Sequence, residues 1–367
     1  AAVRARSELA SQPELQAAVQ SSIGATYLGL GRLDDALREL TDALTTRRRI
    51  GLVEDLPSSL YHVARAYAER GDATIADSLF RQSLTGYREA RPVDSLEIAR
   101  VLNDLGDVLQ YQGRLDEALV MQREALATRR AVQGAPAEEI AASLNNVAVI
   151  VGQQGQMDQA EPLLREAVEL IRKARGPQHA DVASGLNALA FVLGERGSFA
   201  AADSMYREAL RIRRAVLGPD HPEVALTLGQ YGWLQHDNGQ FDSATVLARA
   251  VLTRRGNGLP DTHPMVASTL VLLGQSLIAT GRAGEAEGPL REALALRKAA
   301  LPADHWLIAV TKSVLGDGLL TQGRRGEAGP LLQQGYDGLR ATRGDDHALT
   351  RQAAARVARW KERTEAR

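Results

Sequence analysis

Apolar residues recur at intervals of three and four along this chain, in pairs of stretches that are separated by a glycine. Leu102, Leu105 and Leu109 follow the spacing of one helix face before Gly113, and the same spacing resumes at Leu115. A glycine at this point permits the left-handed backbone conformation that ends a helix. The pattern predicts pairs of antiparallel amphipathic helices, each pair joined by a tight turn.

The turn sequence itself is repeated. GRLDEA begins at Gly113 and returns in variants, with the first two glycines 40 residues apart and all later ones 42 apart. These turn glycines are Gly31, Gly71, Gly113, Gly155, Gly197, Gly239, Gly281 and Gly323. One helix pair cannot bury its apolar faces alone, so such units stack on their neighbours. We therefore predict an all-α solenoid of about eight helix-pair repeats over 13–347, preceded by a helix tail in 1–12 and followed by a capping helix in 348–367.

Small residues mark the predicted helix crossings. Seven positions before the turn glycines the chain has only Gly or Ala, such as Gly106 and Gly274, and five positions after them it always has Ala. A larger side chain would separate the paired helices at a cost of about 1–3 kcal/mol. Twelve positions after the turn, Val251 is the one bulky residue, so we expect a local adjustment in the sixth unit.

This pattern resembles the tetratricopeptide repeat over nearly the whole chain. The 42-residue period and the segments LNNVA (144–148) and GPDHPEVA (218–225) are similar to those of kinesin light chains. The resemblance implies a right-handed superhelix in which the first helix of each pair lines a concave surface. It also implies a role in binding proteins or peptides.

Composition excludes several other classes of function. The net charge of −1 argues against a protein that binds nucleic acid or an anionic membrane, and the absence of cysteine excludes disulfides and thiolate sites. No nucleophile elbow, phosphate-binding loop or zinc-protease motif is present. No apolar run approaches the roughly 20 residues that span a bilayer. We expect no enzyme activity, metal or cofactor in this chain, and the cellular compartment stays open.

Five histidines share one position in successive loops. His179, His221, His263, His305 and His347 are 42 residues apart, whereas metal ligands must converge on one ion. We therefore expect a structural role. In GPDHPEV, either Asp220 or His221 can cap the following helix, and Pro222 suits its first turn.

The predicted concave surface is the remaining place for function. In the family that this chain resembles, exposed inner positions fall thirteen, ten, six, three and two residues before the turn glycine. At these positions the chain has Arg65, Arg100, Asn103, Asp107, Tyr111, Asn145, Asn187, Phe191, Trp233, His236 and Gln275, among others. Together these residues form the candidate binding groove.

Two features of that groove suggest a peptide ligand. Asn103, Asn145 and Asn187 occupy one position in three successive units, and their carboxamides can bond an extended backbone. Phe191 and Trp233 are expected to form a pocket for one anchoring side chain. The alternative is that the asparagines bond neighbouring helices and that Trp233 is partly buried between units. No lysine occupies the asparagine position in any unit, which argues against the clamp that holds the carboxylate tails of chaperones.

A narrower resemblance concerns the two ends of the array. Residues 8–37 and 301–332 look like the first and last repeats that follow the kinase domain in many bacterial Ser/Thr protein kinases. The resemblance implies the sensor or scaffold arm of a signalling protein, and because the chain begins with Ala1 we expect it to be part of a longer one. A self-assembly module without a peptide ligand is the alternative. The basic helix after 347 is expected to be a solvated cap or a basic docking surface.

Overall fold

The computed structural model describes residues 9, 11–256 and 259–365, and it is all-α over these ranges. Seventeen α-helices are present there, together with a 3-10 turn at Val53–Asp55 and one isolated β-bridge between Arg255 and Leu259. The chain divides into two compact units, unit 1 (Ala1–Pro177) and unit 2 (Gln178–Arg367). Most of the helix tail expected at 1–12 lies outside the described residues.

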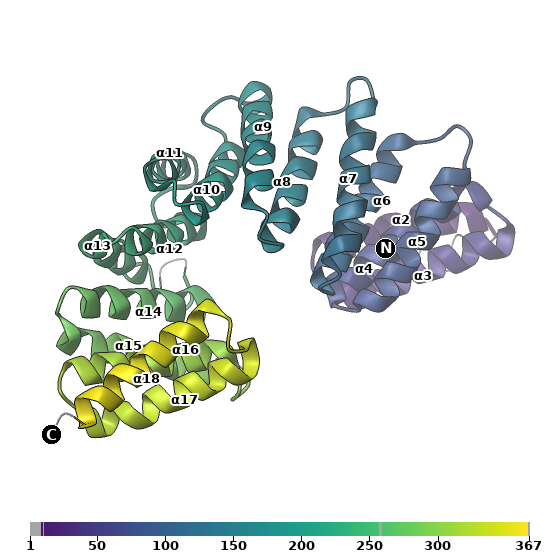
Figure 1. Cartoon of the computed structure of the whole chain (residues 1–367). Helices are drawn as coiled ribbons and strands as arrows, with labels where there is room; N and C mark the ends of the chain where they lie inside the picture. Colours follow the sequence, from purple (N-terminus) through teal and green to yellow (C-terminus); the bar gives the residue numbers. More distant parts are fainter. Residues whose placement is uncertain (1–8, 10, 257–258, 366–367) are drawn as a thin grey trace. The chain divides into compact units, whose positions relative to one another are not determined.

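Unit 1 contains four helix pairs. In each pair the two helices pack against one another, and in the first three pairs the second helix also packs on the first helix of the next pair. The helices are α2 (Pro13–Gly29), α3 (Leu33–Ile50), α4 (Leu56–Arg70), α5 (Ala73–Glu89), α6 (Ser95–Tyr111), α7 (Leu115–Ala131), α8 (Ala137–Gln153) and α9 (Met157–Arg175) (Figure 1).

Unit 2 continues the arrangement with four pairs and a final helix. The helices are α10 (Ala180–Glu195), α11 (Phe199–Leu217), α12 (Pro222–Asp237), α13 (Phe241–Leu252), α14 (Pro264–Ala279), α15 (Ala283–Ala300), α16 (Trp306–Thr321), α17 (Arg325–Arg343) and α18 (Ala348–Glu365). The first helices contact one another in the order α12, α14, α16, and α18 packs on both α16 and α17. The predicted solenoid of helix pairs is confirmed.

The turns adopt the predicted backbone. All eight turn glycines have positive φ angles, from 70° at Gly31 to 93° at Gly71. The crossings are equally tight: a Cβ on Gly274 would lie 2.5 Å from the Cγ of Leu290. In the sixth unit, where Val251 is fully buried, α13 has only 12 residues, whereas the other second helices have 17 to 19.

The repeated histidines are helix caps. The Nδ1 atoms of His179, His221, His263 and His305 each accept a 3.2 Å hydrogen bond from the backbone N–H two residues later. The Nδ1 of His347 accepts the same bond from the backbone N–H of Leu349. The cap of α12 is thus His221 rather than Asp220.

Within the described ranges, no helix combines the length and the apolar character that crossing a membrane requires.

Candidate functional site

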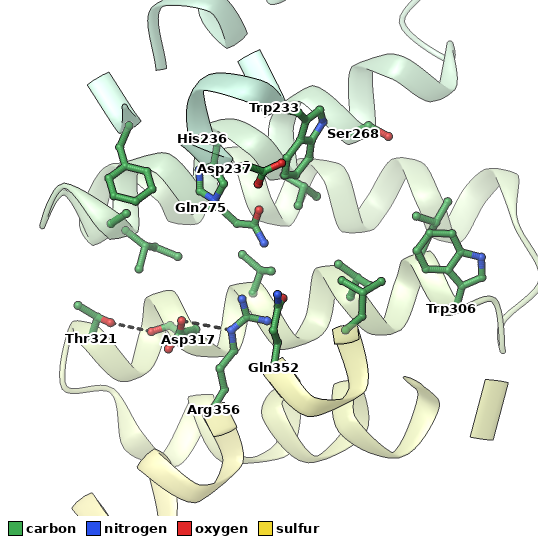
Figure 2. Close-up of a pocket in the computed structure, with 18 of the residues that line it drawn as sticks. Trp233, His236, Asp237, Ser268, Gln275, Trp306, Asp317, Thr321, Gln352 and Arg356 are labelled. Atoms are coloured by element: carbon green, nitrogen blue, oxygen red, sulfur yellow. Dashed lines mark hydrogen bonds and ion pairs between the residues drawn. The ribbon is translucent and has the colours of Figure 1, made fainter. Parts of the chain in front are cut away.

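A cleft of about 770 Å³ opens among the first helices of unit 2. Side chains from α12, α14, α16 and α18 form most of its walls, and α13 and α15 each contribute one residue. Figure 2 shows Trp233, His236 and Gln275 on one side of this cleft, with Asp317 and Arg356 opposite them. Several of its residues hold repeat positions expected to face the groove; Trp233, Gln275 and Asp317 stand six residues before their turn glycines.

One wall of the cleft is aromatic and apolar. The His236 ring meets Trp233 edge-on with a centroid distance of 5.9 Å, and it meets Phe241 in the same way at 5.1 Å. The Nδ1 of His236 lies 3.0 Å from the Oγ of Ser276. Burial, aided by the positive charge of Arg356, lowers the pKa of His236, which favours the neutral imidazole.

The opposite wall carries charge from the last helix. Asp317 is buried, and its carboxylate lies 3.4 Å from Arg356 and 2.9 Å from Arg359, so two arginines share one partner. Burial lowers the pKa of Arg356. Arg356 on α18 points into the cleft (Figure 2), so one face of this last helix lines the cleft.

Arg297 and Trp306 complete the cleft beside α16. Arg297 is only 5% exposed and donates to the carbonyl of Leu307 (2.9 Å) and the hydroxyl of Thr311 (2.7 Å). Trp306 is the first residue of α16, and the Arg343 guanidinium lies 4.2 Å from the centroid of its ring. The cleft therefore combines two indole rings with three arginines and two aspartates.

The predicted groove residues of unit 2 divide into two sets. Trp233, His236 and Gln275 line the cleft. Phe191 is 48% exposed on α10 and is not among the residues that line this cleft. Asn187 is 8% exposed and donates a 2.7 Å hydrogen bond to Gln230 of the next repeat.

The predicted residues of unit 1 form a polar surface along its first helices. Arg65 lies 3.8 Å from Asp104, and Arg100 pairs with Glu97 at 2.6 Å. Tyr111 is 78% exposed at the end of α6.

Asp107 lies on the same surface and accepts a 2.8 Å hydrogen bond from Gln122. Its side chain reaches solvent, but partial burial between the helices and the negative charge of Asp104 raise its pKa to about 7.

The three asparagines that share one repeat position, Asn103, Asn145 and Asn187, differ in their hydrogen bonds. The side chain of Asn103 accepts a 2.9 Å hydrogen bond from Asn146 of the next repeat, as Asn187 is bonded to Gln230. These two asparagines therefore have the packing role that the sequence left open. Asn145 is half-buried and makes no side-chain hydrogen bond within the described ranges, so its carboxamide stays available.

Family models identify the repeat. A tetratricopeptide repeat model matches residues 55–131, 139–215 and 181–257, and a second tetratricopeptide repeat model matches 16–50 and 266–307. The chain belongs to the tetratricopeptide repeat family. No curated protein gives a significant sequence match.

Solved structures show the same tetratricopeptide repeat fold. BtubC (BKLC) from P. vanneervenii is 24% identical over 62% of this chain and 93% of that one, with a TM-score of 0.54. A variant of the nearly identical TPR-like repeats from a putative kinesin light chain of Podosopora anserina is 22% identical over 57% and 99%, with a TM-score of 0.50. A signal transduction ATPase with a tetratricopeptide repeat sensor from Pyrococcus horikoshii is 15% identical over 92% and 50%, with a TM-score of 0.65.

Tetratricopeptide repeats form protein–protein interaction scaffolds, and repeats of this kind are generally non-catalytic. In the part of the chain that the structure describes, no cluster of three His, Asp or Glu residues is arranged to hold a metal ion. The sequence pattern did not select Arg297, Trp306, Asp317 or Arg356. Asp317 could have been found from the sequence, since it occupies the same repeat position as Trp233.

Proposed function

We propose that this tetratricopeptide repeat protein is a non-catalytic scaffold that binds a segment of a partner protein in the cleft of unit 2. The observation that carries the proposal is the cleft itself, in which Trp233 and Trp306 line a cavity of about 770 Å³ on the first-helix face. Concave sites of roughly 300–1,000 Å³ with apolar walls and a few polar groups are the usual form of a binding site. Aromatic side chains in such pockets supply much of the binding energy of an interface.

Selection from a peptide library tests this proposal. The full chain is immobilised and used to select from a phage-displayed library of random dodecapeptides, and the affinity of each enriched peptide is then measured by fluorescence anisotropy. We expect Trp233→Ala to weaken binding about tenfold or more, which corresponds to about 1.4 kcal/mol.

Phe191→Ala is the matched control, because Phe191 holds the same repeat position as Trp233 but does not line the cleft. It should change affinity less than about twofold. Equal losses in the two variants, or a library without enriched peptides, would argue against a binding site in the cleft.

Self-assembly is the competing function, and light scattering distinguishes it. A scaffold for a peptide stays monomeric across a concentration series, and its mass does not change on addition of an enriched peptide. A mass that rises with concentration and falls in Trp233→Ala would identify a second copy of the chain as the occupant.

We further propose that the chain is the sensor arm of a bacterial signalling protein. The likeness of residues 8–37 and 301–332 to repeats that follow bacterial kinase domains supports this role. The existence of a tetratricopeptide repeat sensor in the Pyrococcus horikoshii signalling ATPase is compatible with it. Sequencing of the encoding locus upstream of Ala1 is the test, and the proposal expects a kinase catalytic domain in the same reading frame.

A further inference from the structure

A buried arginine stands sixteen residues after the turn glycine in every second repeat. The four are between 3% and 9% exposed, and each donates to a hydroxyl group on the first helix of the following repeat. The pairs are Arg47 with Ser59, Arg129 with Ser143, Arg213 with Thr227, and Arg297 with Thr311.

Three of these arginines also have a carboxylate from their own chain. Arg47 lies 3.3 Å from Asp55, Arg129 lies 3.3 Å from Glu139, and Arg213 lies 2.7 Å from Glu223. The carboxylate stands at or near the start of the next first helix. A guanidinium without such a partner is costly to bury, because it loses hydration and gains no opposite charge.

The fourth arginine lacks this partner. The residue ten positions after Arg297 is Leu307, where the two preceding copies have Glu139 and Glu223. Among the residues that the structure describes, no carboxylate lies within 4.0 Å of Arg297, and its remaining contact is with Ser268 at 3.4 Å. Burial lowers the pKa of Arg297 to about 10, with no nearby anion to oppose the shift.

Arg297 also differs from the other three in its position. Together with Ser268, Trp306 and Leu307 it lines the cleft of unit 2, so the place where a carboxylate is missing adjoins the candidate binding site. The cleft contains three arginines against two aspartates, and Asp317 is already shared by two of those arginines. Arg356 and Arg359 both have an ion-pair partner in Asp317, whereas Arg297 has no carboxylate within 4.0 Å among the described residues.

We propose that Arg297 binds an acidic side chain of the partner segment, which supplies from another molecule the carboxylate that Glu139 and Glu223 supply within the chain. This inference rests on the proposed function and names the chemistry of the ligand: an aspartate or glutamate flanked by apolar residues. The flanking residues would pack on Trp306 and Val310, which also line the cleft. The site differs from a lysine clamp on the first helices, because its cation comes from α15, a second helix.

Two matched peptide pools test the inference. Both contain N-acetylated, C-amidated heptapeptides with flanking positions drawn from Leu, Phe, Val, Ala and Ser, and the central residue is Glu in one pool and Gln in the other. Retention on the immobilised full chain is measured by mass spectrometry. We expect the Glu pool to be retained about tenfold more strongly, equivalent to one charge-assisted pair.

Three variants assign the preference to Arg297. Arg297→Gln removes the cation. Leu307→Glu keeps every arginine of the cleft and supplies Arg297 with a carboxylate from its own chain. Both should reduce the preference for Glu to less than about twofold. Arg213→Gln, at the same repeat position but outside the cleft, should retain it. Circular dichroism verifies the fold of each variant, and Leu307→Glu still tests the inference if Arg297→Gln does not fold.

Each contrary result has a distinct meaning. Equal retention of both pools by the wild-type chain overturns the carboxylate inference and leaves peptide binding in the cleft intact. A Glu preference that persists in folded Leu307→Glu and Arg297→Gln overturns the assignment to Arg297. Retention of neither pool overturns the inference, and a library without enriched peptides would separately overturn the proposed function.

Discussion

The side-chain amide of Asn187 donates a 2.7 Å hydrogen bond to Gln230, the residue 43 positions later. The same offset joins Asn146 to Asn103 at 2.9 Å. Because the repeat is 42 residues long, this offset connects one first helix to the neighbouring position on the next. The asparagines are therefore not equivalent: two of them hold repeats together, whereas Asn145 is followed at this offset by Ala188, which has no polar side chain.

This difference predicts different stabilities for two similar variants. Asn103→Ala removes a bridging carboxamide and leaves Asn146 without its partner, so it should lower the free energy of unfolding by about 1–2 kcal/mol. Asn145→Ala removes no hydrogen bond within the described residues and should cost less than about 0.5 kcal/mol. Urea unfolding followed by circular dichroism measures both. Equal losses in the two variants would contradict the packing role of Asn103.

The helix crossing at Gly274 predicts a steric effect. Gly274→Ala would place a Cβ 2.5 Å from the Cγ of buried Leu290, so the Leu290 side chain or the helices must shift. The expected loss is about 1–3 kcal/mol of unfolding free energy. Gly284→Ala on α15 is the control, because nothing lies within 4 Å of its Cβ position. It should be neutral or slightly stabilising, and a loss of similar size in both variants would refute the steric explanation.

The buried arginines predict opposite effects on stability when a carboxylate partner is removed and when one is added. Glu223→Leu leaves Arg213 without its carboxylate, and since Glu223 is 44% exposed the expected loss is about 1–2 kcal/mol, less than for a fully buried pair. Leu307→Glu provides Arg297 with the missing partner and should raise the midpoint of thermal unfolding. Calorimetry on both variants is the measurement. If Leu307→Glu lowers the midpoint, Arg297 does not need an anion.

The raised pKa of Asp107 predicts that the stability of the fold depends on pH. Its pKa rises from 3.8 to about 7 on folding, mainly through burial and then through the charge of Asp104. The folded chain thus holds this proton more tightly, so the wild-type protein loses stability as pH rises from about 4 to about 7. Asp107→Asn should remove this loss and be more stable than wild type at pH 8, by less than about 1 kcal/mol because the side chain reaches solvent.

Urea titrations of both proteins between pH 4 and pH 8 test this expectation. The two proteins should have nearly equal unfolding free energies at the acid end, where the carboxyl is neutral in both states. A difference that stays constant over the whole range would show that Asp107 does not titrate between these values.

Much of the fold was predictable because the repeat makes local signals consistent. The turn glycines and the small crossing residues are all defined by spacing, and the described backbone agrees at each of them. The histidine caps were predictable as a class. The choice of His221 over Asp220 was not, since either side chain can accept a bond from the first turn.

The candidate site was only partly predictable. Position within the repeat selected Trp233, His236 and Gln275, which line one cleft, and also Phe191, which does not line that cleft. It omitted Arg297, because a second-helix residue is not expected on the concave face. The absent carboxylate was visible in the sequence as Leu307 in place of glutamate, although nothing local showed that this position borders a cleft.

The sequence by itself determined the helix pairs, their turns and their close crossings, since these depend on contacts that recur every 42 residues. Tertiary structure alone decided which groove positions share a cavity and which asparagines are already bonded. It also decided that α18 supplies Arg356 to the cleft and that Arg297 is buried beside it without an anion. Those features depend on side chains from several repeats that meet in one cleft. A single difference in one repeat, such as Leu307 in place of glutamate, changes the charge and the packing there.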